Sequence, residues 1–253
     1  MKRRSGTSGG HSIVCGVALL SGVVSAAAVC TIVGCGANVG DGLLPQITIF
    51  FDDFDGVLAA GWELDGDGDV PHSLTDRPGF LRIYPQTVST STTAATPGVL
   101  ARELEGDFVV TTRMQFDPLL DFQLAGLVVF GPNADELVTF GLVSASGARG
   151  TFRGLLLRAD RGADVAPGRA AAVFSGDEVF LRLERTGNTY VGSYSNDGLS
   201  FTRVGSVTND LPGSVEVGLG AIKSDSCGDL CDQIIPADFD FFEVSIPVAG
   251  TSG

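Results

Sequence analysis

From Gln46 onward, short stretches of alternating apolar and polar residues are separated by Gly, Asn, Asp or Pro. A period of two predicts β-strands with one buried face, and the separating residues are those that tight turns favour. No stretch after the amino-terminal segment has a helical period of sufficient length to predict a helix. The clearest expected strands are residues 108–116, 122–130, 137–143, 152–157, 179–185, 189–195, 200–207, 215–222 and 239–248.

Two turn sequences support this interpretation. Thr186-Gly187-Asn188 and Asn196-Asp197-Gly198 each lie between alternating runs, where Gly and Asn tolerate a positive φ and so predict hairpins. About a dozen strands without a break in composition predict one all-β domain, a two-sheet antiparallel jelly-roll sandwich. We place this domain at residues 46–248 and treat residues 249–253 as a tail.

The amino terminus predicts export. Lys2, Arg3 and Arg4 precede an apolar run over residues 13–33, which is the order of a signal sequence. Ile32-Val33-Gly34-Cys35 resembles a bacterial lipobox, so Cys35 is the expected lipidation site, residues 1–35 the signal and 36–45 a tether.

Two alternatives to lipidation stay open. Ala26-Ala27-Ala28 could be an ordinary cleavage site, and the apolar run is close to the roughly 20 residues that span a bilayer as an anchor. Each interpretation places the rest outside the cytoplasm of a bacterium, with membrane contact only through the lipid or anchor.

Composition narrows the function further. The 253 residues are 44% hydrophobic, which supports a real core, and carry 16 Lys+Arg against 30 Asp+Glu for a formal charge of −14. Such a charge repels phosphate backbones, so we expect no nucleic-acid partner. Because His72 is the one His outside the signal, a multi-His metal site within one chain is excluded.

The cysteines agree with export. Cys15 and Cys30 lie in the signal and Cys35 in the lipobox, which leaves Cys227 and Cys231. A close pair in an exported chain predicts a local disulfide. Three residues separate the two sulfurs, whereas thioredoxin-type redox sites have two.

Several motifs follow one another in an order that resembles a known family. They are Phe51-Asp52-Asp53-Phe54-Asp55-Gly56, Gly61-Trp62, Pro78-Gly79-Phe80-Leu81-Arg82-Ile83, Gln123-Leu124-Ala125-Gly126-Leu127, Leu181-Arg182-Leu183-Glu184-Arg185, Gly187-Asn188-Thr189-Tyr190, Ser195-Asn196-Asp197-Gly198-Leu199-Ser200-Phe201 and Ala237-Asp238-Phe239-Asp240-Phe241-Phe242. Together they resemble concanavalin A-like domains, most closely the carboxy-terminal domains of certain β-xylosidases and their stand-alone relatives. The resemblance covers most of residues 48–246 and implies a lectin-like sandwich with a saccharide-related role. We expect no attached glycosidase domain, which speaks against catalysis.

Clusters of Asp suggest a calcium site, because hard cations prefer several carboxylate oxygens. One cluster is Asp65-Gly66-Asp67-Gly68-Asp69; another would combine Asp52, Asp53 and Asp55 with Asp238 and Asp240, since first and last strands commonly neighbour each other in such sandwiches. The resemblance is compatible with a structural ion there. Solvated acidic turns are the alternative.

Paired carboxylates could also make the protein a glycoside hydrolase. The sequence Asp238-Phe-Asp240-Phe-Phe-Glu243 superficially resembles the Glu-x-Asp-x-x-Glu strand of concanavalin-like glucanases. A strict period of two places Glu243 on the face opposite Asp238 and Asp240, so we interpret this segment as a closing strand.

Sugar binding by a sandwich requires outward-facing aromatic and polar side chains. With Val179, Leu181 and Leu183 facing the core, Arg182 and Glu184 face outward, although a cross-strand ion pair is an alternative role for Glu184. Tyr190 and Tyr194 share a face, with Gly192 leaving room between them. The expected carbohydrate-binding residues are Gln123, Arg182, Glu184, Tyr190, Tyr194 and Trp62, the last with a place in the core as its alternative.

The leading hypothesis is therefore an exported, lipid-anchored carbohydrate-binding module without catalysis, whose partner is an oligo- or polysaccharide and whose candidate cofactor is Ca2+. A carboxylate-based glycoside hydrolase or other sugar-processing enzyme is the second hypothesis, and a structural surface protein is the third. A deep cleft with two facing carboxylates favours the enzyme, a shallow aromatic site favours the module, and an extended apolar patch favours the structural protein.

Overall fold

The computed structural model describes residues 45–65, 70–88, 99–119, 122–131, 136–147, 150–161, 167–224 and 233–248. The lipobox with Cys35, the pair Cys227 and Cys231, and residues 66–69 of the Asp-Gly cluster lie outside the described residues. Within these ranges no helix is long and apolar enough to cross a membrane.

The described residues form sixteen strands and no helix. Their bounds are β1 Gln46–Asp52, β2 Glu63–Asp65, β3 His72–Ser73, β4 Leu81–Ile83, β5 Gln86–Val88, β6 Val99–Glu105, β7 Phe108–Gln115, β8 Gln123–Phe130, β9 Glu136–Gly147, β10 Gly150–Arg161, β11 Gly168–Val173, β12 Glu178–Thr186, β13 Thr189–Ser195, β14 Thr202–Thr208, β15 Ser214–Ser224 and β16 Ala237–Pro247.

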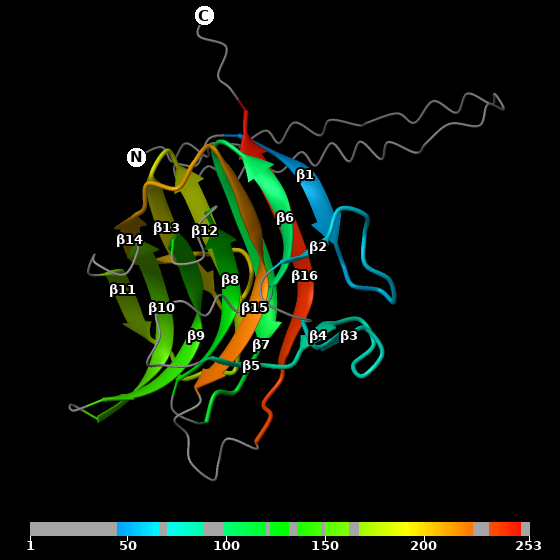
Figure 1. Ribbon diagram of the computed structural model, residues 1–253, viewed down its shortest axis with the longest axis vertical. Helices are drawn as coiled ribbons and strands as arrows, with labels where there is room; N and C mark the ends of the chain where they lie inside the picture. Colours follow the sequence, from blue (N-terminus) through cyan, green and yellow to red (C-terminus); the bar gives the residue numbers. More distant parts are fainter. Residues whose placement is uncertain are drawn as a thin grey trace, which may run out of the picture. The chain divides into compact units, whose positions relative to one another are not determined.

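Two eight-stranded sheets pack face to face (Figure 1). Sheet A has the order β14-β13-β12-β7-β16-β4-β3, with β1 paired to β16; sheet B has the order β11-β10-β9-β8-β15-β6-β2, with β5 paired to β15. The β5–β15 pair is parallel and the other described pairs are antiparallel. The predicted two-sheet sandwich is confirmed, and first and last strands do pair.

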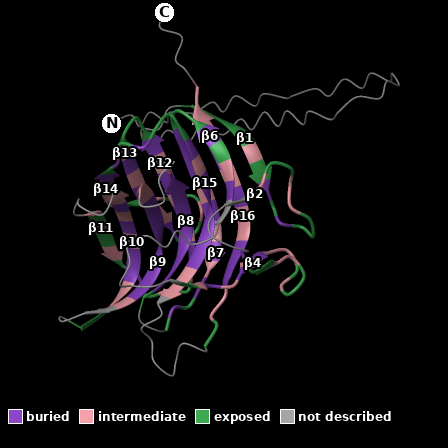
Figure 2. Cartoon of the chain, in the orientation of Figure 1, coloured by how far each residue is buried: buried purple, intermediate pink, exposed green. Residues whose placement is uncertain are grey.

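The core lies between the two sheets. Strand β12 alternates buried and half-buried residues along its length, with Val179, Leu181 and Leu183 fully buried. The buried positions run as purple bands along the central strands in Figure 2. Strand β8 is buried at every residue, so both of its faces are covered. This strand order makes β7, β12 and β16 the centre of sheet A, with one face inward and one outward.

Each of the nine expected strands is present, but the sequence pattern missed several others. Strands β1, β6 and β11 were not expected individually, nor were the short strands β2 to β5. Strand β11 reads Gly-Arg-Ala-Ala-Ala-Val and β6 carries three charged residues, so neither has the composition that predicts a strand. Pairing with neighbouring long strands stabilises them instead.

The two predicted hairpin turns are confirmed. Gly187 joins β12 to β13 with φ +54°, and Gly198 joins β13 to β14 with φ +73°. In the second turn the Asp197 carboxylate accepts the backbone N–H groups of Ser200 at 2.9 Å and Leu199 at 2.8 Å. These bonds, with that from the Ser195 hydroxyl, lower the pKa of Asp197 to about 2.

A β-bulge in β16 corrects one expectation about that strand. The pairing with β7 shifts register between Phe239 and Phe241, so that Asp238, Phe241 and Glu243 lie opposite the outward residues Gln115, Arg113 and Thr111. The extra residue, Asp240, also reaches Arg113 on that side. The expectation that Glu243 faces away from Asp238 and Asp240 is therefore wrong, because a bulge breaks the period of two.

Candidate functional site

The outward face of sheet A carries two of the expected binding residues. Arg182 and Glu184 alternate with the buried leucines of β12 and are half-buried. The Arg182 guanidinium carbon lies 3.5 Å above the ring centre of Phe201, which follows the β13–β14 turn. Arg182 thus lies beside an aromatic ring on this face, as a cation–π pair.

Tyr190 does not belong to that surface. It is fully buried, because β13 places Tyr190, Gly192 and Tyr194 opposite Arg185, Leu183 and Leu181 of β12, and the two leucines lie in the core. The room at Gly192 is filled by the Phe140 ring, whose nearest atom would lie 2.9 Å from an added Cβ. The expectation of an outward Tyr190 is wrong: period-two alternation pairs residues on one face without saying which face is inward.

Gln123 is also turned inward, contrary to the expectation. It is 1% exposed and shares its face of β8 with the core residues Ala125 and Leu127. Its side-chain Oε1 accepts the backbone N–H of Leu119 at 2.9 Å. Gln123 therefore supports the segment that enters β8, and it is shielded from any ligand on the surface.

Trp62 has the structural role that was its alternative. Its ring packs against Phe242 at 4.8 Å and Phe50 at 5.6 Å between ring centres, and its indole N–H donates to Asp52 Oδ2 at 2.7 Å. Asp52, 4% exposed, also accepts the backbone N–H groups of Phe54 and Ala59. Both Asp52 oxygens therefore accept bonds that hold the β1–β2 loop.

The five Asp residues expected to share a calcium ion are not brought together. Asp53 and Asp55 are exposed, and Asp240 is paired with Arg113 at 2.8 Å. Across the described ranges, no group of three His, Cys, Asp or Glu side chains could hold a metal ion. The expectation of one site shared by these residues is not met by the geometry, and calcium binding itself stays a prediction.

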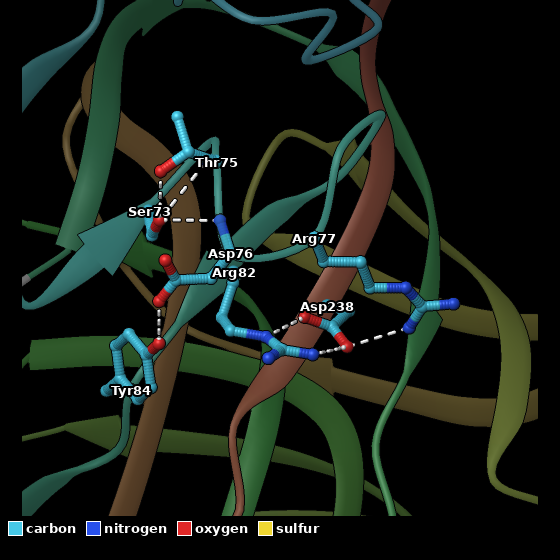
Figure 3. A network of polar contacts seen from close by, with 7 residues as sticks. All are labelled: Ser73, Thr75, Asp76, Arg77, Arg82, Tyr84 and Asp238. Carbon is cyan, nitrogen blue, oxygen red and sulfur yellow. Dashed lines mark hydrogen bonds and ion pairs between the residues drawn. The ribbon is translucent and has the colours of Figure 1, made fainter.

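Asp238 forms ion pairs with two arginines (Figure 3). Arg82 donates from Nε at 2.7 Å and from Nη2 at 2.9 Å, and Arg77 donates from Nη1 at 2.7 Å. Burial alone would raise the pKa of Asp238, and the bonds from Arg82 and Arg77 more than offset it, so that the pKa is lowered. A carboxylate already neutralised by two guanidinium groups attracts calcium poorly.

The same network orders the segment before β4. The Ser73 hydroxyl accepts the backbone N–H groups of Thr75 at 3.2 Å and Asp76 at 3.0 Å, and the Tyr84 hydroxyl donates to the Asp76 carboxylate. These two side chains lower the pKa of Asp76, Tyr84 having the larger effect. The network ties the β3–β4 loop to β16, which is a structural role.

A pocket of about 390 Å³ lies where the β11–β12 loop meets the end of β13. Tyr194 and Phe174 meet there edge to face, with ring centres 5.6 Å apart and planes at 76°. Its lining residues are Val173, Phe174, Ser175, Gly176, Asp177, Glu178, Tyr194 and Asn196. The half-buried Tyr194 therefore stands beside two acidic side chains and one amide, while the Phe174 ring, 9% exposed, belongs to the core.

Glu178 is the charged group of this pocket with a defined partner network. Its carboxylate accepts from Arg113 at 2.8 Å and from Gln115 at 2.5 Å. These bonds, that from Arg113 first, lower the pKa of Glu178, so the group stays ionised at neutral pH. An ionised Glu178 accepts hydrogen bonds and does not serve as a proton donor.

Of the residues expected to bind carbohydrate, Tyr194 alone lines this pocket. Sequence reasoning missed Phe174, Asp177, Glu178 and Asn196. A signal was present in the segment Phe174-Ser175-Gly176-Asp177-Glu178, where a ring and two acids flank a turn between strands. Its proximity to Tyr194 depends on strand pairing, which the sequence pattern does not give.

Residues 52–245 match the family described as the beta xylosidase C-terminal concanavalin A-like domain. A xylan 1,3-beta-xylosidase of a Vibrio species is 28% identical over 183 residues; the match covers 68% of this chain and 32% of that protein, so the chain spans only that part of its curated relative.

Solved structures share the fold. The GH43 BlXynB protein of Bacillus licheniformis matches with a TM-score of 0.62 at 20% identity, covering 78% of this chain and 39% of that one. A functionally unknown protein of Saccharomyces cerevisiae matches with a TM-score of 0.57 at 13% identity, covering 75% of this chain and 98% of that one.

Proposed function

Because the chain belongs to the family of concanavalin A-like domains found at the carboxy terminus of β-xylosidases, we propose that it is an exported carbohydrate-binding module that holds a neutral saccharide without cleaving it. The observation that carries the proposal is the pocket in which Tyr194 and Phe174 stand beside Asp177, Glu178 and Asn196. A xylan-derived saccharide is the first ligand to test, since the curated relative is a xylan 1,3-beta-xylosidase.

The pocket has the chemistry that sugar rings need. Aromatic faces pack against the C–H groups of a pyranose, while carboxylate and amide groups bond its hydroxyls. A volume of about 390 Å³ lies within the range of small-molecule sites, roughly 300–1,000 Å³. The fixed negative charge of Glu178 and the formal charge of −14 favour a neutral ligand over an anionic one.

The state of Glu178 supports binding at this pocket. A glycosidase needs one carboxylic acid whose raised pKa keeps it protonated near neutral pH. The bonds from Arg113 and Gln115 lower the pKa of Glu178, so this carboxylate is suited to accepting hydrogen bonds from sugar hydroxyls.

Export and anchoring complete the proposal. The basic amino terminus, the apolar run and the lipobox support lipidation at Cys35, and the extracytoplasmic location would favour a Cys227–Cys231 disulfide. Mass spectrometry of the protein isolated from membranes would test both modifications. An unmodified Cys35 would remove the lipid anchor from the proposal, and two free thiols would remove the disulfide.

The binding test is titration calorimetry with xylo-oligosaccharides on the wild type, on Tyr194→Ala and on Tyr84→Ala. Tyr84 is a matched control, because it bonds Asp76 in the β4 network and does not line the pocket. We expect Tyr194→Ala to weaken binding at least tenfold, about 1.4 kcal/mol, and Tyr84→Ala to leave it unchanged. A wild type that binds no xylo-, manno- or gluco-oligosaccharide would refute the proposal.

One observation favours hydrolysis as a second candidate function. Glu103 of β6 and Glu216 of β15 lie directly opposite each other and line another pocket, of about 330 Å³. Most glycosidases need a pair of carboxyl groups that face each other across the scissile bond. Release of nitrophenol from aryl xylosides, lost in Glu216→Gln and retained in Tyr194→Ala, would establish this candidate.

A further inference from the structure

Three phenylalanine rings form a row on the outward face of sheet A. Phe180 of β12 and Phe241 of β16 have ring centres 6.3 Å apart, and Phe241 stacks on Phe51 of β1 with centres 6.0 Å apart and planes at 23°. The row, Phe180-Phe241-Phe51, crosses four strands, because β7 lies between β12 and β16. We call these three residues the aromatic row.

The row is not part of the hydrophobic core. Phe51 is 53% exposed, and Phe180 and Phe241 are half-buried on the face opposite the core residues Leu181 and Phe242. The bulge in β16 turns Phe241 outward, since a regular strand would point residues 239 and 241 to the same side as each other. Apolar rings gathered on an outward face indicate a contact surface.

The polar groups within the row are already neutralised. Arg113 of β7 is the cross-strand partner of both Phe180 and Phe241, and it is paired with Glu178 and Asp240, each at 2.8 Å. The pKa of Arg113 is raised by these two carboxylates, Glu178 first. The row therefore offers aromatic faces flanked by hydrogen-bonding groups but no unpaired cation at Arg113.

We propose that the aromatic row is a second saccharide-binding surface, which takes a long neutral polysaccharide lying across sheet A. The ligand class rests on the proposed function. Glu178 borders both this surface and the pocket at Tyr194, but none of the three rings of the row lines that pocket. The three rings are not coplanar, since Phe241 stacks on Phe51 and is tilted by 47° from Phe180. A chain that crosses the strands would meet the exposed parts of these rings at points 6.0 and 6.3 Å apart, and such an open surface gains affinity only over several contacts.

Charge favours a neutral polysaccharide over an anionic chain or a second copy of the protein as the ligand of the aromatic row. An anionic chain would meet a protein of formal charge −14 whose Arg113 is already neutralised, and a second copy of the chain would bring the same net charge to the face. A neutral polysaccharide carries no such penalty and presents flat C–H surfaces to the rings. Its hydroxyls can bond the carboxylates of Glu178 and Asp240 at the edge of the row.

The test compares two ligands and three variants of the full chain: sedimentation with insoluble xylan, and calorimetry with xylotriose. The variants are the double substitution Phe51→Ala/Phe241→Ala, Tyr194→Ala, and the control Val57→Ala, which removes a side chain that is 76% exposed and lies outside the row. We expect the double variant to lose at least tenfold in apparent affinity for xylan and nothing for xylotriose. Val57→Ala should match the wild type on both ligands.

The outcomes separate the two proposals. Unchanged xylan binding by the double variant overturns the aromatic row, whether or not the pocket binds. If the wild type binds xylan but not xylotriose, and the double variant loses xylan, the pocket fails and the row stands. A wild-type dimer by light scattering that becomes monomeric in the double variant assigns the row to a second copy and overturns the proposal. Thermal unfolding of each variant checks that it is folded.

Discussion

The ion pairs of Asp238 give the sharpest test of how the sandwich is closed. Asp238→Asn keeps the size of the side chain and removes its charge from a position that is 6% exposed. Three charge-assisted bonds from Arg77 and Arg82 meet at this carboxylate, and they tie the loop before β4 to the last strand. The substitution leaves both guanidinium groups without their anion.

The expected loss in the free energy of unfolding follows from how deeply the ion pairs are buried. Removing one partner of a fully buried pair costs about 3–5 kcal/mol, whereas exposed pairs contribute about 0–1 kcal/mol. The Asp238 side chain is 8% exposed and its arginines are 24% and 30% exposed, so the pair lies between these limits and nearer the buried one. We expect Asp238→Asn to lower the free energy of unfolding by about 3 kcal/mol at pH 7.

The sign of the pH dependence is fixed by the lowered pKa. The folded-state pKa of Asp238 lies below its ordinary value of 3.8, so the contribution is fully present above that value and is lost as the pH falls through the folded pKa. The difference between wild type and Asp238→Asn should therefore be constant at and above about pH 5 and shrink below about pH 4.

Urea unfolding of both proteins between pH 3 and pH 7 measures this. For an m-value of about 2–3 kcal/mol per M, the expected loss corresponds to a midpoint lower by roughly 1 M at pH 7. Asp240→Asn is the control, because its pair with Arg113 is about 30% exposed on both sides, and it should cost at most about 1 kcal/mol. Equal losses in the two variants, or a difference for Asp238→Asn that does not shrink in acid, would refute the reasoning.

Four further substitutions, of which Gly213→Ala is a control, test other parts of the structure. Tyr190→Ala should cost about 3–5 kcal/mol in urea unfolding, because its ring is fully buried; a folded variant with normal stability and lost saccharide binding would contradict its place in the core. Asp52→Ala should cost about 2 kcal/mol and shift the emission of Trp62, the one tryptophan, since the indole N–H loses its acceptor; unchanged fluorescence would contradict that bond. Gly141→Ala would bring a Cβ within 2.0 Å of a backbone oxygen of β8 and should cost more than 2 kcal/mol, whereas Gly213→Ala meets nothing within 4 Å and should change the thermal midpoint little.

The family and the sandwich could be predicted from the sequence because they depend on local and repeated signals. Alternation marked the long strands, and the turns at Gly187 and Gly198 follow from the tolerance of Gly for positive φ. The ordered motifs between residues 48 and 246 resembled the family that the match over 52–245 then showed.

Much of the candidate site depends on information that alternation does not carry. A period of two predicts that Tyr190 and Tyr194 lie on one face of the strand. Only the pairing of β13 with β12, which places Gly192 and Tyr194 opposite Leu183 and Leu181, shows that this face is the core. Tyr194 escapes burial in part because it lies at the end of β13, where the β11–β12 loop brings Phe174 and Glu178 to it. Such contacts join segments that are distant in the sequence.

The sequence by itself determined the strands with a clear period of two, the two hairpin turns, the family and the acidic charge, because each depends on neighbouring residues or on composition. Only the tertiary structure decided the roles of the carboxylates and rings. In the folded protein Asp238 pairs with two arginines, Asp52 accepts a hydrogen bond from Trp62, and a bulge in β16 places Phe241 and Glu243 on the outward face. The physical reason is that a side chain's partners are set by strand order and register, which are properties of the whole folded sheet.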